Sequence, residues 1–134
     1  MLEQEIGAAL PADYRAFLAE HDGGRPEPST FSVPSHEEKS FDVQVLFGLA
    51  RMTESSNLAW NFRQYRARVG DERLPIGCTD TNDLVLIELA GDSRGRIVFW
   101  DSMAKSTKEA FHEVSSSFRE FLDGLSDIEA SEHA

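Results

Sequence analysis

The stretch from residue 10 to residue 24, LPADYRAFLAEHDGG, constrains the fold more than any other part of the chain. Pro11 suits the first turn of a helix, where its missing N–H costs nothing, and two glycines can supply the left-handed backbone that ends a helix. Between them, apolar and aromatic side chains recur at spacings of three and four residues. This inward stripe comprises Tyr14, Phe17, Leu18 and His21. The stretch therefore predicts an amphipathic helix that packs on a core.

Three more helices are expected from the same kind of periodicity. In the middle of the chain the predicted core face consists of Leu58, Phe62, Tyr65 and Val69, with Ser55, Ser56 or Asn57 as the cap. Near the end it consists of Phe118, Phe121, Leu122 and Leu125, with Ser117 and Glu120 in capping-box spacing. Leu2, Ile6 and Leu10 predict a short helix at the start.

Strand signals lie between these helices. Phe41, Val43, Val45 and Phe47 alternate with other residues and predict a half-buried strand. Further strands are expected at residues 76–79, 84–89, 96–100 and 111–114. The segments 84–87 and 97–100 are apolar at every position, which is typical of central strands covered on both faces. The prediction is an α+β fold: a mainly antiparallel sheet of about five to six strands, flanked by N-terminal, middle and C-terminal helices.

The remaining segments predict loops and a single domain. Residues 23–34 contain three prolines and predict an ordered loop or a short extended piece, whereas 36–40 are polar and expected to be exposed. The length suits one domain over residues 1–126, with residues 127–134 as a frayed acidic tail.

Several motifs, in order, resemble the SUKH superfamily, which includes fungal cell-wall-assembly regulators of the Smi/Knr type and bacterial immunity proteins. The resemblance is carried by LPADYRAFL at 10–18, VLFGL at 45–49, LPIGCTD at 74–80, LVLIEL at 84–89, GRIVFWD at 95–101 and SSFREFL at 116–122. His21-Asp22 stands where the family often has an asparagine before the glycines, and Asn82 where a turn glycine is common. All matched residues are packing or turn residues, so the resemblance implies the fold and, less directly, a protein-binding role.

The net charge of the chain limits the kinds of molecule that it is expected to bind. Its 24 acidic and 13 basic side chains give a net charge of −11. Nucleic-acid binding is not expected, because phosphate contacts require clustered Lys and Arg. Acidic residues concentrate in 1–50 and 109–134, whereas residues 51–73 carry five arginines. The acidic ends could steer a basic partner, or they could serve solubility alone.

Catalytic and metal-binding patterns are not found in the sequence. The four histidines form no His-x-x-x-His pair and have no cysteine cluster nearby, so we expect no metal and no cofactor. Asp80 and Asp83 are explained as turn residues. The single cysteine, Cys78, excludes an internal disulfide and agrees with a reducing compartment. Its apolar setting predicts a small buried side chain; a nucleophile paired with a histidine such as His112 is the competing interpretation.

Five residues are candidates for partner binding: Glu37, Glu38, Asp42, Trp60 and Arg63. The two glutamates lie in the polar segment 36–40. Trp60 falls on the helix face opposite the predicted core, beside Arg63, and has the character of an interface anchor. Burial of Trp60 under the segment 25–40, or under the mate in a homodimer, is the other interpretation, and burial is favoured.

The favoured function is non-catalytic protein binding, and the resemblance points to a bacterial immunity protein that neutralises a cognate toxin, possibly a nuclease. An intracellular adaptor of the fungal type is the alternative, and a small cysteine-dependent enzyme ranks last. No apolar run is long enough for a membrane helix and the N-terminal residues do not resemble a secretory signal, so a cytoplasmic location is expected.

Overall fold

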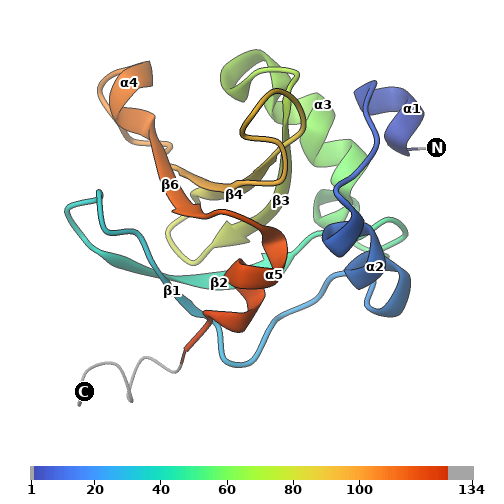
Figure 1. The fold of residues 1–134 in the computed structure, drawn as a ribbon, viewed down its shortest axis with the longest axis horizontal. Coiled ribbons are helices and arrows are strands. Elements are labelled where there is room, and N and C mark those ends of the chain that lie inside the picture. Colours follow the sequence, from blue (N-terminus) through green and yellow to red (C-terminus); the bar gives the residue numbers. More distant parts are fainter. Residues whose placement is uncertain (1, 127–134) are drawn as a thin grey trace.

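Six strands follow one another across a single antiparallel sheet, in the order β1-β2-β3-β4-β5-β6 (Figure 1). A computed structural model describes residues 2–126. The strands are β1 (Thr30–Ser32), β2 (Ser40–Leu46), β3 (Arg73–Thr79), β4 (Leu84–Glu88), β5 (Ile97–Trp100) and β6 (Phe111–Ser115). Neighbours in sequence are neighbours in the sheet because antiparallel strands need only a turn between them. The predicted α+β fold is confirmed.

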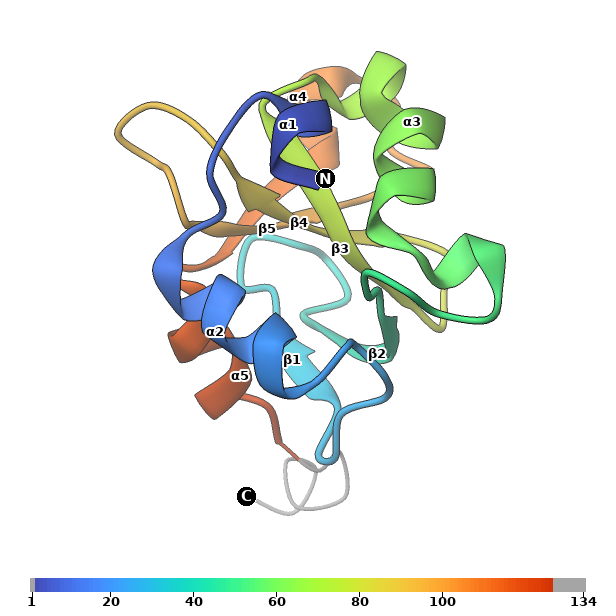
Figure 2. The same cartoon turned by 90° about the vertical axis from the view of Figure 1, so that its right-hand side faces the viewer.

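The helices are α1 (Leu2–Ile6), α2 (Ala12–Glu20), α3 (Leu58–Val69), α4 (Thr107–Ala110) and α5 (Phe118–Asp123), with a 3-10 turn η1 (Glu54–Ser56) before α3. The long helix α3 packs against β3, and α1 packs against α3. On the other side of the molecule α2 packs against α5 (Figures 1 and 2). The three helical regions expected from the sequence therefore flank the sheet.

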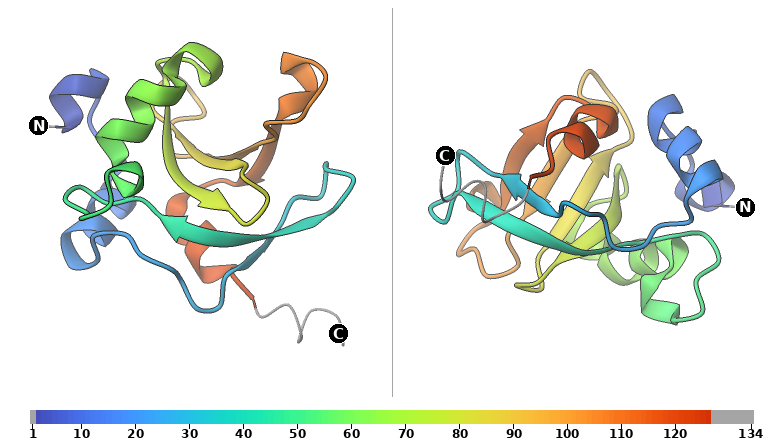
Figure 3. Two further views of the ribbon diagram at one scale, coloured as in Figure 1. Left: turned by 180° about the vertical axis from the view of Figure 1, so that it is seen from behind. Right: turned by 90° about the horizontal axis from the view of Figure 1, so that it is seen from below.

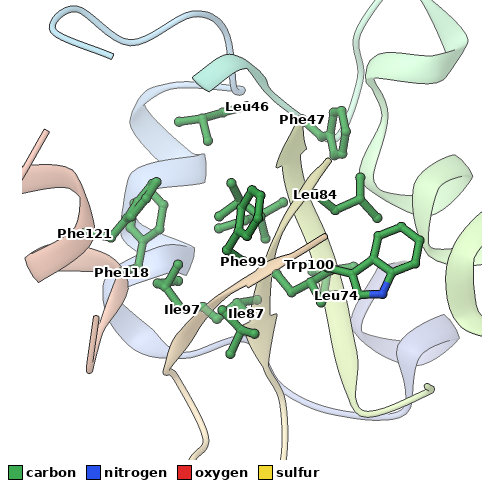
Figure 4. Close-up of a cluster of buried hydrophobic side chains, with 14 of the residues drawn as sticks. Leu46, Phe47, Leu74, Leu84, Ile87, Ile97, Phe99, Trp100, Phe118 and Phe121 are labelled. Atoms are coloured by element: carbon green, nitrogen blue, oxygen red, sulfur yellow. The ribbon is translucent and has the colours of Figure 1, made fainter. Parts of the chain in front are cut away.

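The core lies where β4 and β5 cross the middle of the sheet (Figure 4). All four residues of β5 and the first four of β4 are buried, as their unbroken apolar sequence predicts. The aromatic rings of Phe99 on β5 and Phe41 on β2 stack at 4.2 Å between centroids. Phe31 on β1 contacts both Phe99 and Phe121 of α5. The curled sheet thus brings its first two strands over its fifth.

The helix α2 confirms most of the predicted stripe. Tyr14 and Leu18 are buried and Phe17 is partly buried against the core. The prediction for His21 was wrong: its side chain is 66% exposed. The helix ends at Glu20 and His21 takes extended backbone angles, so the helical spacing no longer places its ring inward. At Gly23, φ is +81° and a side chain would overlap the backbone of Leu46 and Phe47.

In strand β2 the predicted alternation fails after Val43. The register against β3 shifts between Val43 and Val45, and Leu46 is buried instead of Val45, which is partly exposed. A bulge adds one residue to the strand and turns the following side chains to the opposite face. Phe47 remains buried because it follows the strand end.

The middle and last helices confirm their predicted core faces. Leu58, Phe62 and Val69 are buried and Tyr65 is partly buried. The Ser117 hydroxyl accepts a hydrogen bond from the Glu120 backbone N–H at 3.1 Å, as the capping-box spacing predicts. The short extended piece allowed for residues 23–34 is β1, which also forms a bridge from Thr30 to Ser126. The predicted frayed tail, residues 127–134, lies outside the described residues.

Candidate protein-binding surface

The turn between β1 and β2 presents Glu37 and Glu38 at its tip, where both are exposed. Backbone hydrogen bonds close this turn from Val33 N to Lys39 O at 2.7 Å and from His36 N to Val33 O at 3.0 Å. Lys39 has φ of +70° and its ammonium group donates to the Pro34 carbonyl at 3.0 Å. The turn therefore holds the two glutamates in a defined place.

His36 anchors the turn to the sheet, although the segment 36–40 was predicted to be exposed. Its side chain is only 14% exposed. The ring packs edge-on against Phe41 at 5.0 Å and Phe99 at 5.5 Å between centroids. Nδ1 accepts the Glu38 backbone N–H at 3.0 Å, so the proton lies on Nε2 and is donated to Asp101 Oδ2 at 3.0 Å. The prediction of exposure was wrong for His36 because its ring packs in a pocket formed by Phe41 on β2 and Phe99 on β5.

A second link joins the same turn to β6. His112 Nε2 donates to the Glu109 carbonyl at 2.9 Å, which leaves Nδ1 to accept the Ser35 hydroxyl at 2.7 Å. The His36 and His112 rings meet at 5.0 Å. Two hydrogen-bonded links therefore fix the turn, one to Asp101 in the loop that connects β5 to α4 and one to His112 on β6.

Between these two loops lies a hollow of about 750 Å³, which we call the acidic groove. Its walls carry five carboxylates, from Glu37, Glu38, Asp83, Asp101 and Glu109, together with Lys105 and the exposed side chain of Met103.

Two of these carboxylates are used inside the fold. Asp83 accepts hydrogen bonds from Thr81 and Ser102, and Asp101 accepts them from His36 and the Met103 N–H. Burial acts to raise the pKa of Asp101, but these hydrogen bonds outweigh it and hold the pKa below its usual value. The carboxylates of Glu37, Glu38 and Glu109 make no hydrogen bond or ion pair with the described residues, so they are available to a cation.

Asp42, Trp60 and Arg63 lie away from the acidic groove. Asp42 accepts hydrogen bonds from the hydroxyls of Ser29 at 3.2 Å and Thr30 at 2.6 Å, and so joins β1 to β2. Arg63 forms a two-point ion pair with Glu5, at 2.7 and 3.0 Å, which links α3 to α1. These contacts within the fold already engage Asp42 and Arg63.

Trp60 is partly buried on α3, and it is not one of the side chains that pack against the main core. The segment 25–40 that was expected to cover it instead forms β1 and the turn to β2, on the other side of the molecule (Figures 1 and 3). The structure thus brings together Glu37 and Glu38 from the predicted set. It also adds Ser35, His36, Asp101 and His112, which no local spacing in the sequence could reveal.

Cys78 is partly buried on β3, where its neighbours across the sheet are Val45 and Leu84. Burial raises the pKa of the thiol, which disfavours the reactive thiolate. Its sulfur lies 3.9 Å from Gln44 Oε1, and β4 and β5 separate its strand from that of His112. Within residues 2–126, no group of three or more His, Cys, Asp or Glu side chains is arranged to hold a metal ion.

A family model for the SMI1/KNR4 family (SUKH-1) matches residues 1–124, the span that forms the sheet and its flanking helices. The chain belongs to this family. It is 26% identical, over 140 residues, to the SPbeta prophage-derived uncharacterized protein YokK of Bacillus subtilis (strain 168), with 94% of this chain and 71% of that protein covered. No solved structure gives a significant match to this SUKH-1 chain. None of its described helices is both long and apolar enough to cross a membrane.

Proposed function

We propose that this SUKH-1 protein is a non-catalytic immunity protein that neutralises a cognate toxin by direct binding in the bacterial cytoplasm. The observation that carries the proposal is the acidic groove, where Glu37, Glu38 and Glu109 have carboxylates not used inside the fold. The two histidine links hold these groups in place before binding, which lowers the ordering cost of association. The SUKH family includes immunity proteins, and the relative in Bacillus subtilis comes from a prophage.

The partner that fits this groove is a basic protein surface. A net charge of −11 attracts a basic partner at long range, and the free glutamates supply short-range pairing with Lys or Arg. A nuclease is a suitable toxin class because its substrate cleft must be basic to bind phosphates. Blocking such a cleft would stop the enzyme without any chemistry by the immunity protein.

The first experiment uses the product of the neighbouring reading frame, in a catalytically inactive form, as the binding probe. We expect the two proteins to bind, and co-expression of the chain with the active form to rescue growth. If the protein is instead an adaptor of the fungal type, neither binding nor rescue is expected. A cysteine-dependent enzyme predicts turnover that Cys78→Ala abolishes, but the raised pKa of Cys78 weighs against that alternative.

Charge reversal tests the acidic groove. The double variant Glu37→Lys, Glu38→Lys should slow association and reduce its salt dependence, with less effect on dissociation. The matched control is Glu72→Lys, Asp92→Lys, which changes the net charge equally at exposed positions outside the groove.

Trp60→Ala tests the α3 face, where loss of an anchor would appear as a faster off-rate and cost roughly 2 kcal/mol of binding free energy. If the association and dissociation rates change neither with salt concentration nor with any of these substitutions, the electrostatic account is wrong.

A further inference from the structure

His36 can hold the turn between β1 and β2 in its present form only while its ring is neutral. Its Nε2 donates to the Asp101 carboxylate, and its Nδ1 accepts the Glu38 backbone N–H at 3.0 Å. Protonation adds a hydrogen to Nδ1, and two donors would then face one another, because a backbone N–H cannot act as an acceptor. The charged ring can still donate to Asp101. Protonation therefore breaks the bond to Glu38 while the ring keeps its link to the loop after β5.

His112 differs in this respect, although its ring lies 5.0 Å from that of His36. Its Nδ1 faces the Ser35 hydroxyl at 2.7 Å, and a hydroxyl group can accept a hydrogen bond as well as donate one. Its Nε2 proton, which is donated to the Glu109 carbonyl, is present in both charge states of the ring. Protonation of His112 therefore reverses one hydrogen bond and breaks none. Of the two rings that hold the turn, only that of His36 loses a bond when it takes up a proton.

The bond that would be lost fixes a part of the turn where the backbone is strained. Lys39 has φ of +70°, a conformation that residues other than glycine seldom adopt. Two backbone bonds at this tip stay within the turn, from Lys39 N to His36 O at 3.2 Å and from Ser40 N to Glu38 O at 2.8 Å. The bond from Glu38 instead reaches a side chain that is packed on the sheet. Its loss frees the tip to relax from the strained conformation.

Charged groups of both signs surround the His36 ring. Carboxylates attract a proton to the ring and cations repel it. The carboxylates come from the turn itself, the turn between β3 and β4, the residue after β5, and α4; they are Glu37, Glu38, Asp83, Asp101 and Glu109. The cations are Lys39 on the turn, Lys105 in the loop before α4, and His112 on β6 when it is protonated. Histidine ordinarily changes its charge between about pH 5 and pH 8, above the range in which glutamate takes up a proton. A response of His36 is therefore separable from titration of the carboxylates.

We propose that His36 is an acid-sensitive switch, in which protonation frees the Glu38 N–H and releases the tip of the turn, so that Glu37 and Glu38 are no longer held in place. The switch is a property of the isolated protein, and its effect on a partner rests on the proposed function. A basic partner that binds the ordered turn selects the neutral ring. Its affinity should be full where His36 is neutral and should fall as the pH falls through the titration of that ring.

An NMR titration of the full chain from about pH 8 to about pH 5 tests the switch. The amide resonance of Glu38 should shift together with the ring resonances of His36. Its protection from hydrogen exchange, corrected for the intrinsic rate, should fall about tenfold or more. A Glu38 amide that does not respond while the His36 ring titrates would overturn the proposal. So would a His36 ring that stays neutral throughout the titration.

Two variants assign the response to one ring. In His36→Asn the side-chain oxygen can accept the N–H of the residue two positions on, and it does not titrate, so the response of Glu38 should disappear. His112→Asn is the matched control and should leave the response in place. A response that persists in His36→Asn, or is lost in His112→Asn, would overturn the assignment. Melting curves show whether each variant is folded, and if His36→Asn unfolds, the wild type and His112→Asn still decide.

Binding to the inactive toxin is a separate measurement. The wild type should lose about threefold or more affinity, relative to His36→Asn, when the pH falls from about 8 to about 5.5. This ratio removes any titration of the toxin itself. Equal losses in the two proteins would overturn the link between the switch and the acidic groove. Absence of binding at both pH values would contradict the proposed function, whereas the NMR titration would still decide whether the switch exists.

Discussion

The His36 imidazole donates its Nε2 proton to the Asp101 carboxylate at 3.0 Å, although 65 positions separate the two residues in the chain. The bond joins the turn after β1 to the residue that follows β5. His36 also fills an aromatic pocket, so the same side chain contributes packing and a charge-assisted hydrogen bond. The position of Glu37 and Glu38 therefore depends on a contact inside the fold.

Asp101→Asn should lower the free energy of unfolding by about 1 to 2 kcal/mol at pH 7, because it removes the charge that accepts the His36 hydrogen bond. The folded-state pKa of Asp101 lies below its unfolded value, so its stabilising effect is present above that unfolded value, near 4, and is lost as the pH falls through the folded pKa. Urea titrations from pH 7 to pH 3 should show the gap between variant and wild type closing only below about pH 4. Asp92→Asn, at an exposed turn, serves as the control.

Phe118→Ala should destabilise the protein by about 3 to 5 kcal/mol, because its ring is only 1% exposed and leaves a cavity between α2 and α5. Phe17 touches Phe118 at 4.9 Å between centroids but is only partly buried, so Phe17→Ala should cost less, about 1 to 2 kcal/mol. Denaturant unfolding of the two variants measures the difference. Equal losses would contradict the burial seen for these rings.

Tyr14→Phe should leave stability unchanged or raise it by up to about 1 kcal/mol. The Tyr14 hydroxyl is buried and has no hydrogen-bond partner among the described residues, and burial raises the pKa of its phenol. A buried polar group without a partner is unfavourable, so its removal carries no loss. Tyr14→Leu, which changes the ring as well, should be strongly destabilising. A loss of more than 1 kcal/mol in Tyr14→Phe would reveal a hydrogen bond to that hydroxyl.

Alkylation of Cys78 should be at least tenfold slower in the native protein than in the unfolded chain. Burial raises its pKa above the ordinary value of about 8.5, so little thiolate is present at neutral pH. The native rate should continue to rise beyond pH 9. Thiol labelling followed by mass spectrometry measures the alkylation rates of the native and the unfolded protein. A native rate at pH 7 equal to that of the unfolded chain would contradict the prediction and support the cysteine-dependent enzyme.

Residue spacing predicted the parts of the fold that repeat locally. The stripe on α3 and the unbroken apolar run of β5 each follow from a period that the sequence displays directly. Two details could not be predicted from spacing. His21 is exposed because α2 ends one residue before it, and Leu46 is buried in place of Val45 because a bulge turns the side chains that follow it to the opposite face of the strand.

The candidate site was predictable only in part. The polar segment at Glu37 and Glu38 was visible as a charge cluster, and both residues border the acidic groove. His36 and Asp101 gave no signal because contacts between distant segments leave no spacing in a single sequence. Arg63 remains a predicted partner-binding residue, and its ion pair with Glu5 is another contact between distant segments that a single sequence does not reveal.

The consecutive strand order leaves β1 and β6 as the two free borders of the sheet. Unpaired N–H and C=O groups at such borders can add strands from other molecules and lead to aggregates. At the first border, β1 is only three residues long, prolines stand on both sides of it, and Ser126 already pairs with Thr30. At the other, β6 exposes the charged Glu113 and its register against β5 is interrupted. Both borders of the sheet are therefore poor templates for a strand from another molecule, so the fold itself protects the chain against edge-to-edge aggregation.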